Sequence, residues 1–231
     1  MRWLLLLIAL ASPLHAEGEK PGTFDYYVLS ISWSPNWCAY EGNNRGSPQC
    51  DADPGFGWVL HGLWPQYEAG WPSYCPTRWG IPAAKIRKEF GAIMGDPDSA
   101  SYQWRKHGSC SGYGPVGFFD RAKRAFQSVT MPESLTQLGS DRISAAAVEN
   151  AFLAANPELE PDMITITCKS GMIQEARICL TKDLEPRVCG TDVRRDCRAT
   201  SAEFFADVGI GAKTRVRSPI FVHETTSKIY K

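Results

Sequence analysis

Eight cysteines constrain the fold of this 231-residue chain more than any other feature. They are Cys38, Cys50, Cys75, Cys110, Cys168, Cys179, Cys189 and Cys197. An even number of cysteines in a chain that begins with an export signal favours disulfide bonds. Eight cysteines can pair fully in about a hundred ways, so their spacing leaves the connectivity open. A zinc site is the alternative, but no Cys-x-x-Cys pair occurs and the spacings match no zinc motif, so we expect no metal.

Residues 1–16 have the pattern of a secretory signal. Arg2 supplies a positive charge, residues 3–11 form an apolar run, and residues 13–16 are a plausible processing end. The run is too short to span a bilayer, and no second long apolar run follows it. We therefore expect a soluble, periplasmic or secreted protein with no membrane association, whose mature chain is 17–231. The sequence has no Asn-x-Ser/Thr glycosylation site, which weakly favours a bacterial source.

Length and composition indicate one globular domain. A chain of 231 residues can bury a full core but is short for two domains. An apolar fraction of 43% with eight tryptophans is typical of a folded protein. The formal net charge is zero, so nucleic-acid binding would have to depend on a local site rather than on the field of the whole molecule. We expect a monomer.

Apolar periodicity predicts the secondary structure. Strands are expected at residues 24–33, from 57 to 60, and at 164–168, 172–180 and 220–222. Helices are expected at residues 82–94, 101–107, 118–129 and 144–155. Residues 38–54 should form a polar loop, Lys169-Ser-Gly171 a hairpin turn, and Gly108 a left-handed helix end. This uneven segregation of helices and strands predicts an α+β domain with an antiparallel sheet packed with helices.

A first histidine motif, Trp58-Val-Leu-His-Gly-Leu-Trp-Pro65, continues from the second predicted strand. His61 by itself would most simply be a core histidine at a strand end. Gly62 lets the backbone approach a ligand or turn sharply, and Trp64 can present a flat face to a nucleobase. Trp71, in the following loop, is a second candidate for stacking. Core packing is the alternative for both tryptophans.

A second motif, Tyr102-Gln-Trp-Arg-Lys-His-Gly-Ser-Cys110, follows about forty residues later. If this segment is helical, Gln103, Lys106 and His107 share one face, because they stand at positions i, i+3 and i+4. Trp104 then points elsewhere, into the core. An isolated Lys-His pair would more simply be a surface charge and a helix-end histidine.

Two histidines and a lysine suit the cleavage of RNA next to its 2′-hydroxyl group. One histidine can remove the hydroxyl proton while the other protonates the leaving 5′-oxygen, because imidazole titrates near neutral pH. A fixed cation stabilises the negative charge that develops on the phosphorus centre, and the chemistry requires no metal. His223, the remaining histidine after residue 16, is expected to be structural or exposed.

The two motifs, in this order and each placed against a cysteine, resemble the active-site segments of the ribonuclease T2 family of secreted endoribonucleases. Tyr27–Cys38 resembles the family's opening strand. The likeness covers residues 24–197 and leaves 198–231 as a C-terminal extension. It implies a single disulfide-bonded domain without a cofactor that cuts single-stranded RNA through a 2′,3′-cyclic phosphate to 3′-phosphate ends. The implied disulfides are Cys38–Cys50, Cys75–Cys110, Cys168–Cys197 and Cys179–Cys189.

The resemblance also implies roles for individual residues. His107 corresponds to the general base, His61 to the general acid, and Lys106 to the group that stabilises the pentacovalent phosphate. The positions that correspond to base binding are Trp64, Gln66 and Trp71.

The second motif departs from the family pattern, which has His-Glu where this chain has Tyr102 and Gln103. Gln103 cannot ionise but can still hydrogen-bond a phosphate oxygen or the base histidine. Tyr102 can donate to phosphate but carries no positive charge. We expect altered catalysis rather than none. The alternatives are an RNA- or partner-binding protein that has lost activity, and a disulfide-rich structural protein whose histidines are incidental.

Overall fold

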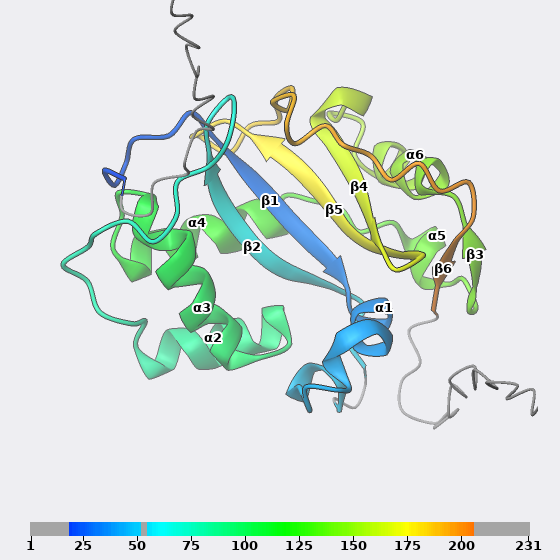
Figure 1. Cartoon of the computed structure of the whole chain (residues 1–231), viewed down its shortest axis with the longest axis horizontal. Coiled ribbons are helices and arrows are strands. Elements are labelled where there is room, and N and C mark those ends of the chain that lie inside the picture. The colour runs from blue at the N-terminus through cyan, green and yellow to red at the C-terminus, as the bar shows by residue number, and fades with distance from the viewer. Residues whose placement is uncertain (1–18, 52–54, 206–231) are drawn as a thin grey trace, which may run out of the picture.

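The computed structural model describes residues 19–51 and 55–205. A twisted sheet runs through the middle of the molecule and helices lie around it, which is the α+β architecture expected (Figure 1). The strands are β1 (Tyr26–Trp33), β2 (Trp58–Gln66), β3 (Asp141–Ile143), β4 (Ile164–Lys169), β5 (Met172–Leu180) and β6 (Ala202–Phe204). Their order is β2-β1-β5-β6-β3, and β4 also pairs with β5.

The sheet is antiparallel, as expected, except at one pair of strands, which makes it mixed. All neighbouring strands are antiparallel except β5 and β6, which pair in parallel through Met172 and Glu203. A tight hairpin forces two strands to be antiparallel, whereas a long connection does not. The chain reaches β6 only after the segment 181–201, so the hairpin constraint is absent there.

Six α-helices cover the sheet in the described part of the chain. They are α1 (Ser34–Trp37), α2 (Ala84–Met94), α3 (Pro97–Lys106), α4 (Pro115–Gln127), α5 (Glu133–Thr136) and α6 (Ala145–Ala155). The four helices predicted from periodicity are α2, α3, α4 and α6. In Figure 1, α2, α3 and α4 lie near β1 and β2, while α5 and α6 lie on the side of β4.

The sheet has two faces, and strand β1 contributes side chains to both of them. Its residues are all buried, and alternate side chains point to opposite sides. Tyr27, Leu29, Ile31 and Trp33 join the main hydrophobic core beneath the helices. The opposite face of the sheet carries a smaller cluster of Tyr26, Val28, Cys179, Cys189 and Val193, against which Trp64 packs. The candidate site lies on this second face.

A β-bulge in β2 brings the first histidine motif to the second face. The pairing with β1 passes from Leu60 directly to Gly62, so His61 is an extra residue without a partner in β1. Leu60 and Leu63 therefore both reach the main core, although a regular strand would place them on opposite sides. The same bulge lets His61 and Trp64 share the face opposite that core.

Several local expectations need correction. The segment predicted as a loop at 38–54 contains a π-helical turn at Cys38–Gly42 and a 3₁₀ turn at Pro48–Cys50, both next to a disulfide. Gly108 does not adopt the left-handed conformation and instead begins the 3₁₀ turn Gly108–Cys110. Its lack of a side chain serves packing, because a Cβ there would lie 2.6 Å from Trp104 and 2.8 Å from Phe118.

Other expectations are confirmed or lie outside the described residues. The turn between β4 and β5 has positive φ at Ser170 and Gly171, as a two-residue hairpin requires. The signal at 1–16 and the strand at 220–222 cannot be compared with the structure, because they fall in the undescribed ranges. None of the described helices has the length and apolar character needed to cross a membrane.

All eight cysteines form disulfides, with the connectivity that the family resemblance implies. The pairs are Cys38–Cys50, Cys75–Cys110, Cys168–Cys197 and Cys179–Cys189. Because every thiol is used in this way, none is available as a zinc ligand.

Candidate active site

A cavity of about 390 Å³ opens between β2, the end of α3, and β5. The eight residues proposed from the sequence all line it: His61, Trp64, Gln66, Trp71, Tyr102, Gln103, Lys106 and His107. The other lining residues, which the sequence reasoning did not single out, are Val28, Gln174, Glu175, Arg177, Asp192 and Val193. Most of the second group come from β5 and from the loop after Cys189.

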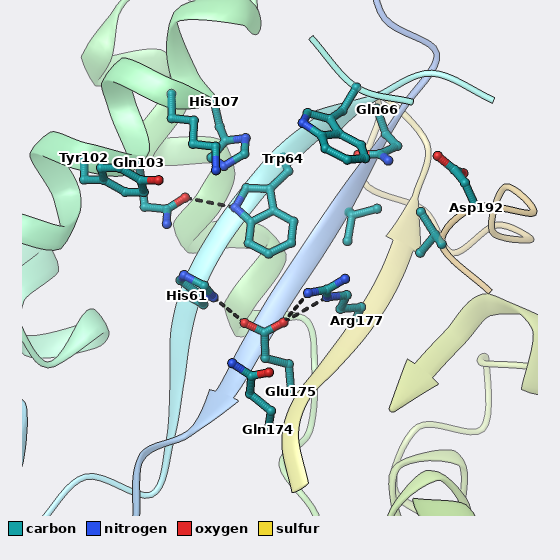
Figure 2. A pocket seen from close by; sticks show the side chains of 14 residues that line it. His61, Trp64, Gln66, Tyr102, Gln103, His107, Gln174, Glu175, Arg177 and Asp192 are labelled. Atoms are coloured by element: carbon teal, nitrogen blue, oxygen red, sulfur yellow. Dashed lines mark hydrogen bonds and ion pairs between the residues drawn. The ribbon is translucent and has the colours of Figure 1, made fainter. Parts of the chain in front are cut away.

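The indole of Trp64 lies between the two histidines (Figure 2). Its ring stands edge-on to His61, with 5.3 Å between ring centroids, and stacks on His107 at 5.2 Å. The guanidinium group of Arg177 lies 5.3 Å from the same indole. Trp64 is therefore a wall of the cavity that is already engaged by protein groups. Trp71, with 43% of its surface exposed, is the more accessible of the two rings.

Gln103 holds Trp64 in this position. The Trp64 Nε1–H group donates a hydrogen bond to Gln103 Oε1 at 2.9 Å, and the glutamine side chain is buried. This bond crosses directly over Gly62. A Cβ at position 62 would lie 2.3 Å from Trp64 Nε1 and 2.4 Å from Gln103 Oε1. Glycine at this position therefore makes room for the hydrogen bond.

His107 is buried at the C-terminal end of α3, with 6% of its surface exposed. Its backbone N–H donates to the carbonyl oxygen of Gln103, and its Nδ1 has no hydrogen-bond partner among the described residues. Burial lowers the pKa of His107 well below its usual value, and the positive charges of Lys106 and His61 lower it further. The ring is therefore neutral at neutral pH.

Neighbouring groups on α3 complete this side of the cavity. The face shared by Gln103, Lys106 and His107 is confirmed, because all three line the cavity. Trp104 points into the main core, as predicted. The ammonium group of Lys106 lies 5.6 Å from the ring centroid of Tyr102, so the tyrosine packs beside the cation.

The strand β5 contributes a carboxylate that the sequence reasoning missed. Glu175 Oε1 lies 2.5 Å from His61 Nδ1, and Glu175 Oε2 accepts from Nε and Nη2 of Arg177 at 2.9 and 2.7 Å. Burial alone would raise the pKa of Glu175, but the charges and hydrogen bonds of His61 and Arg177 outweigh burial and bring that pKa to about 2. Glu175 is therefore ionised over the whole neutral range.

A signal for these residues does exist in the sequence. In the predicted strand 172–180, Ile173 and Ile178 are apolar, whereas Glu175 and Arg177 are charged residues in its middle. Charges at alternate positions of a buried strand indicate a polar face that must be paired. This pattern indicates that Glu175 and Arg177 are paired, but it does not identify His61 as a partner.

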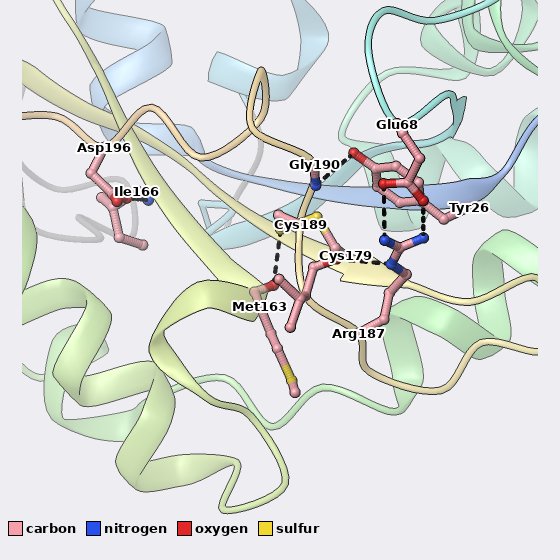
Figure 3. The surroundings of a disulfide bond; sticks show 10 residues. Tyr26, Glu68, Met163, Ile166, Cys179, Arg187, Cys189, Gly190 and Asp196 are labelled. Carbon is pink, nitrogen blue, oxygen red and sulfur yellow. Dashed lines mark hydrogen bonds and ion pairs between the residues drawn. A yellow bond between two sulfur atoms is a disulfide. The ribbon is translucent and has the colours of Figure 1, made fainter.

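Near the far end of the cavity, a disulfide holds the loop that contains Cys189 to the end of β5 (Figure 3). Cys179 at the end of β5 is joined to Cys189, and the backbone N–H of Gly190 donates to the hydroxyl oxygen of Tyr26 at 3.2 Å. Arg187 forms an ion pair with Glu68, with Nη1 2.8 Å from Oε1. These contacts fix the chain just before Asp192 and Val193.

Asp192 links this loop to the loop that carries Trp71. Its Oδ2 atom accepts from the backbone N–H of Gly70 at 2.7 Å. Gln66, at the end of β2, and Trp71 line the same cavity. The base-binding positions implied by the resemblance therefore lie in one cavity with both histidines, and Asp192 adds a carboxylate to it.

The disulfide Cys75–Cys110 ties the loop after β2 to the end of the second histidine motif. Next to it, the backbone N–H of Tyr74 donates to the carbonyl oxygen of Lys106 at 2.9 Å. Lys106 and His107 are thus held from the loop side as well as from α3.

A sequence model of the ribonuclease T2 family matches residues 24–189, which is most of the chain. The chain belongs to the ribonuclease T2 family. Similar proteins include a ribonuclease of Aeromonas hydrophila, 38% identical over 133 residues (58% of this chain and 59% of that protein). Ribonuclease I of Escherichia coli K12 is 23% identical, over 78% of this chain and 83% of that protein.

Solved structures of proteins described as ribonucleases have the same fold. The structure of trichomaglin, described as an S-like ribonuclease, superposes with a TM-score of 0.60 at 20% identity and covers 78% of this chain and 98% of its own. RNase NT, in complex with 5′-AMP, gives a TM-score of 0.56 at 17% identity, over 79% and 98%. The alignments with the ribonuclease of A. hydrophila and a probable ribonuclease of Haemophilus influenzae span only 59% and 58% of those proteins.

Proposed function

We propose that the protein is an endoribonuclease that cleaves single-stranded RNA by acid–base chemistry on two histidines. The observation that carries the proposal is that His61, His107 and Lys106 line one cavity, in which His107 is buried and neutral. A neutral imidazole can accept a proton, whereas a charged one cannot. Family membership and the names of the similar proteins support the same activity.

The proposed reaction has two steps. In the first, His107 takes the proton of the 2′-hydroxyl group, the 2′-oxygen attacks phosphorus, and His61 protonates the departing 5′-oxygen. Lys106 stabilises the negative charge on the phosphorane-like transition state. In the second step water opens the 2′,3′-cyclic phosphate to a 3′-phosphate, and the two histidines exchange roles. Apart from the RNA itself and the water of the second step, both steps balance with groups of this chain.

Substrate binding is assigned to the rest of the cavity. Tyr102 donates from its hydroxyl group to a phosphate oxygen, Trp71 stacks on a base, and Gln66 hydrogen-bonds its edge. Trp64 and Gln103 hold the catalytic side chains in place, and Trp64 binds a base only if a neighbouring group moves aside. The whole site comes from one chain, which fits a monomer. Four disulfides favour an oxidising compartment, either the periplasm or the extracellular space.

The test is cleavage of a defined single-stranded RNA in the presence of EDTA. Wild type is compared with His61→Ala and His107→Ala, and the product ends are identified by mass spectrometry. We expect cyclic phosphates from wild type and a loss of at least about 10²-fold in rate for both variants. His223→Ala serves as the matched control and should cleave like wild type. Tight RNA binding without cleavage by wild type would contradict the proposal and favour an RNA-binding protein instead.

A further inference from the structure

The environments of the two histidines differ in a way that the family motifs do not specify. Among the described residues His107 has no carboxylate partner and is buried, whereas His61 is 42% exposed at its side chain and is bonded to the buried Glu175. A buried carboxylate is costly unless it is paired and hydrogen-bonded. Glu175, with 2% of its side chain exposed, meets that requirement through the cavity side chains His61 and Arg177 and a longer contact from Ser32.

We infer that Glu175, held by Arg177, is a positioning residue that fixes the ring of His61 in the orientation that its proposed role as the acid requires. This inference rests on the proposed function, because it concerns the orientation of the histidine that is proposed to protonate the leaving oxygen. It assigns Glu175 and Arg177 no contact with the reacting atoms.

The orientation of His61 follows from the hydrogen bond. Glu175 is ionised and can only accept, so the Nδ1 atom of His61 must carry the donated proton. That leaves Nε2 as the nitrogen available to the substrate. Arg177 fixes the carboxylate in turn, because its Nε and Nη2 atoms both bind Glu175 Oε2 and leave Oε1 to His61.

The backbone sets this geometry before any substrate is bound. Glu175 and Arg177 stand two residues apart on β5, so they share its polar face. Ser32 on β1 is opposite Glu175 in the strand register, and its hydroxyl lies 3.4 Å from Oε1. The bulge in β2 then directs His61 across β1 toward the same carboxylate.

The experiment compares steady-state kinetics of wild type, Glu175→Gln and Arg177→Gln on a defined dinucleotide, and repeats Glu175→Gln in a His61→Ala background. A residue that acts only by orienting His61 changes the chemical step and leaves substrate binding unchanged. We expect Glu175→Gln to lower kcat by about 10²-fold with little change in KM. In the His61→Ala background the same substitution should have no further effect, because the side chain that Glu175 positions is absent. Arg177→Gln should lower kcat less, since Glu175 keeps its contact with His61.

Controls separate this inference from folding and from the proposed function. Glu203→Gln removes a carboxylate from β6 that pairs with Arg142 outside the cavity, and its kinetics should match wild type. Circular dichroism and the thermal midpoint verify folding. If Glu175→Gln does not fold, Glu175→Asp, which keeps the carboxylate, and Arg177→Gln still decide the question. An unchanged kcat in a folded Glu175 variant, or an equal loss in the His61→Ala background, would overturn the role of Glu175, whereas an inactive wild type would overturn the proposed function.

Discussion

Gln103 lies in the second histidine motif, but its side chain makes a contact that positions a neighbouring side chain. The amide oxygen receives the indole N–H of Trp64, and Trp64 in turn stacks on His107. A glutamate would accept the same hydrogen bond, so the contact itself does not explain why the residue is neutral. What the glutamine changes is charge, because it places no carboxylate beside Trp64 and the buried His107.

We predict that Gln103→Glu moves the acidic limb of the pH–rate profile to higher pH. The carboxylate would favour the charged form of His107 and raise its pKa, so the base would become available only at higher pH. The measurement is kcat/KM against pH for wild type and variant. Gln127→Glu, on the exposed end of α4, is the control for added charge. An acidic limb that stays in place or moves to lower pH would show that His107 does not respond to position 103.

The residues of the candidate site could be predicted from the sequence only where they lie in local motifs. The two histidine segments supplied six of the eight proposed residues, because each segment places several of them within a few positions, and the other two, Gln66 and Trp71, follow shortly after the first segment. Glu175 and Arg177 stand more than a hundred residues after His61, and only the pairing of β5 with β1 brings them together. Strand register over such a separation leaves no local pattern that names the partner.

At the scale of elements, periodicity predicted the long helices and strands and missed the short ones. α2, α4 and α6 begin and end within three residues of the expected bounds. The three-residue strands β3 and β6 are stabilised by pairing with each other and are too short to show a period. α3 begins about one turn earlier than expected, because Asp96 and Pro97 form its first turn.

Asp96 should stabilise the helix that carries Gln103 and Lys106. Its side chain accepts from the backbone N–H of Asp98 at 2.8 Å, which satisfies one of the unpaired donors of the first turn. We predict that Asp96→Ala lowers the free energy of unfolding by about 1 kcal/mol, measured by urea denaturation. Asp98→Ala removes a first-turn charge but no cap, and should lower the free energy of unfolding by about half as much or less. Equal losses in the two variants would mean that the helix dipole, and not the cap, stabilises this turn.

At the scale of the whole molecule, one side of the cavity is formed by the two histidine motifs. The other side is formed by residues from the C-terminal half of the chain. The first side consists of β2 and α3, and the second consists of β5 and the loop that carries Asp192. The Cys179–Cys189 disulfide fastens that loop to the end of β5. The site is therefore complete only when both halves of the sheet have formed.

Two disulfides close loops of nearly equal length. Comparing variants that lack one or the other separates effects on stability from effects on substrate binding. Cys179–Cys189 spans 10 residues and Cys38–Cys50 spans 12, so chain entropy gives each about 3 kcal/mol of stability. Replacing either pair with serines should lower the free energy of unfolding by that amount in urea. Only the first pair borders the cavity, through the loop that carries Asp192.

We therefore predict that the Cys179→Ser/Cys189→Ser variant has a raised KM for single-stranded RNA, whereas the Cys38→Ser/Cys50→Ser variant keeps the wild-type KM. The reason is that Asp192 and Val193 lose their anchor, while the two histidines stay on β2 and α3 and kcat changes little. Steady-state kinetics well below both unfolding midpoints provides the measurement. If KM rises equally in both variants, the loop does not bind substrate. If kcat falls instead in the first variant, the disulfide supports the catalytic geometry through β5, on which Glu175 stands.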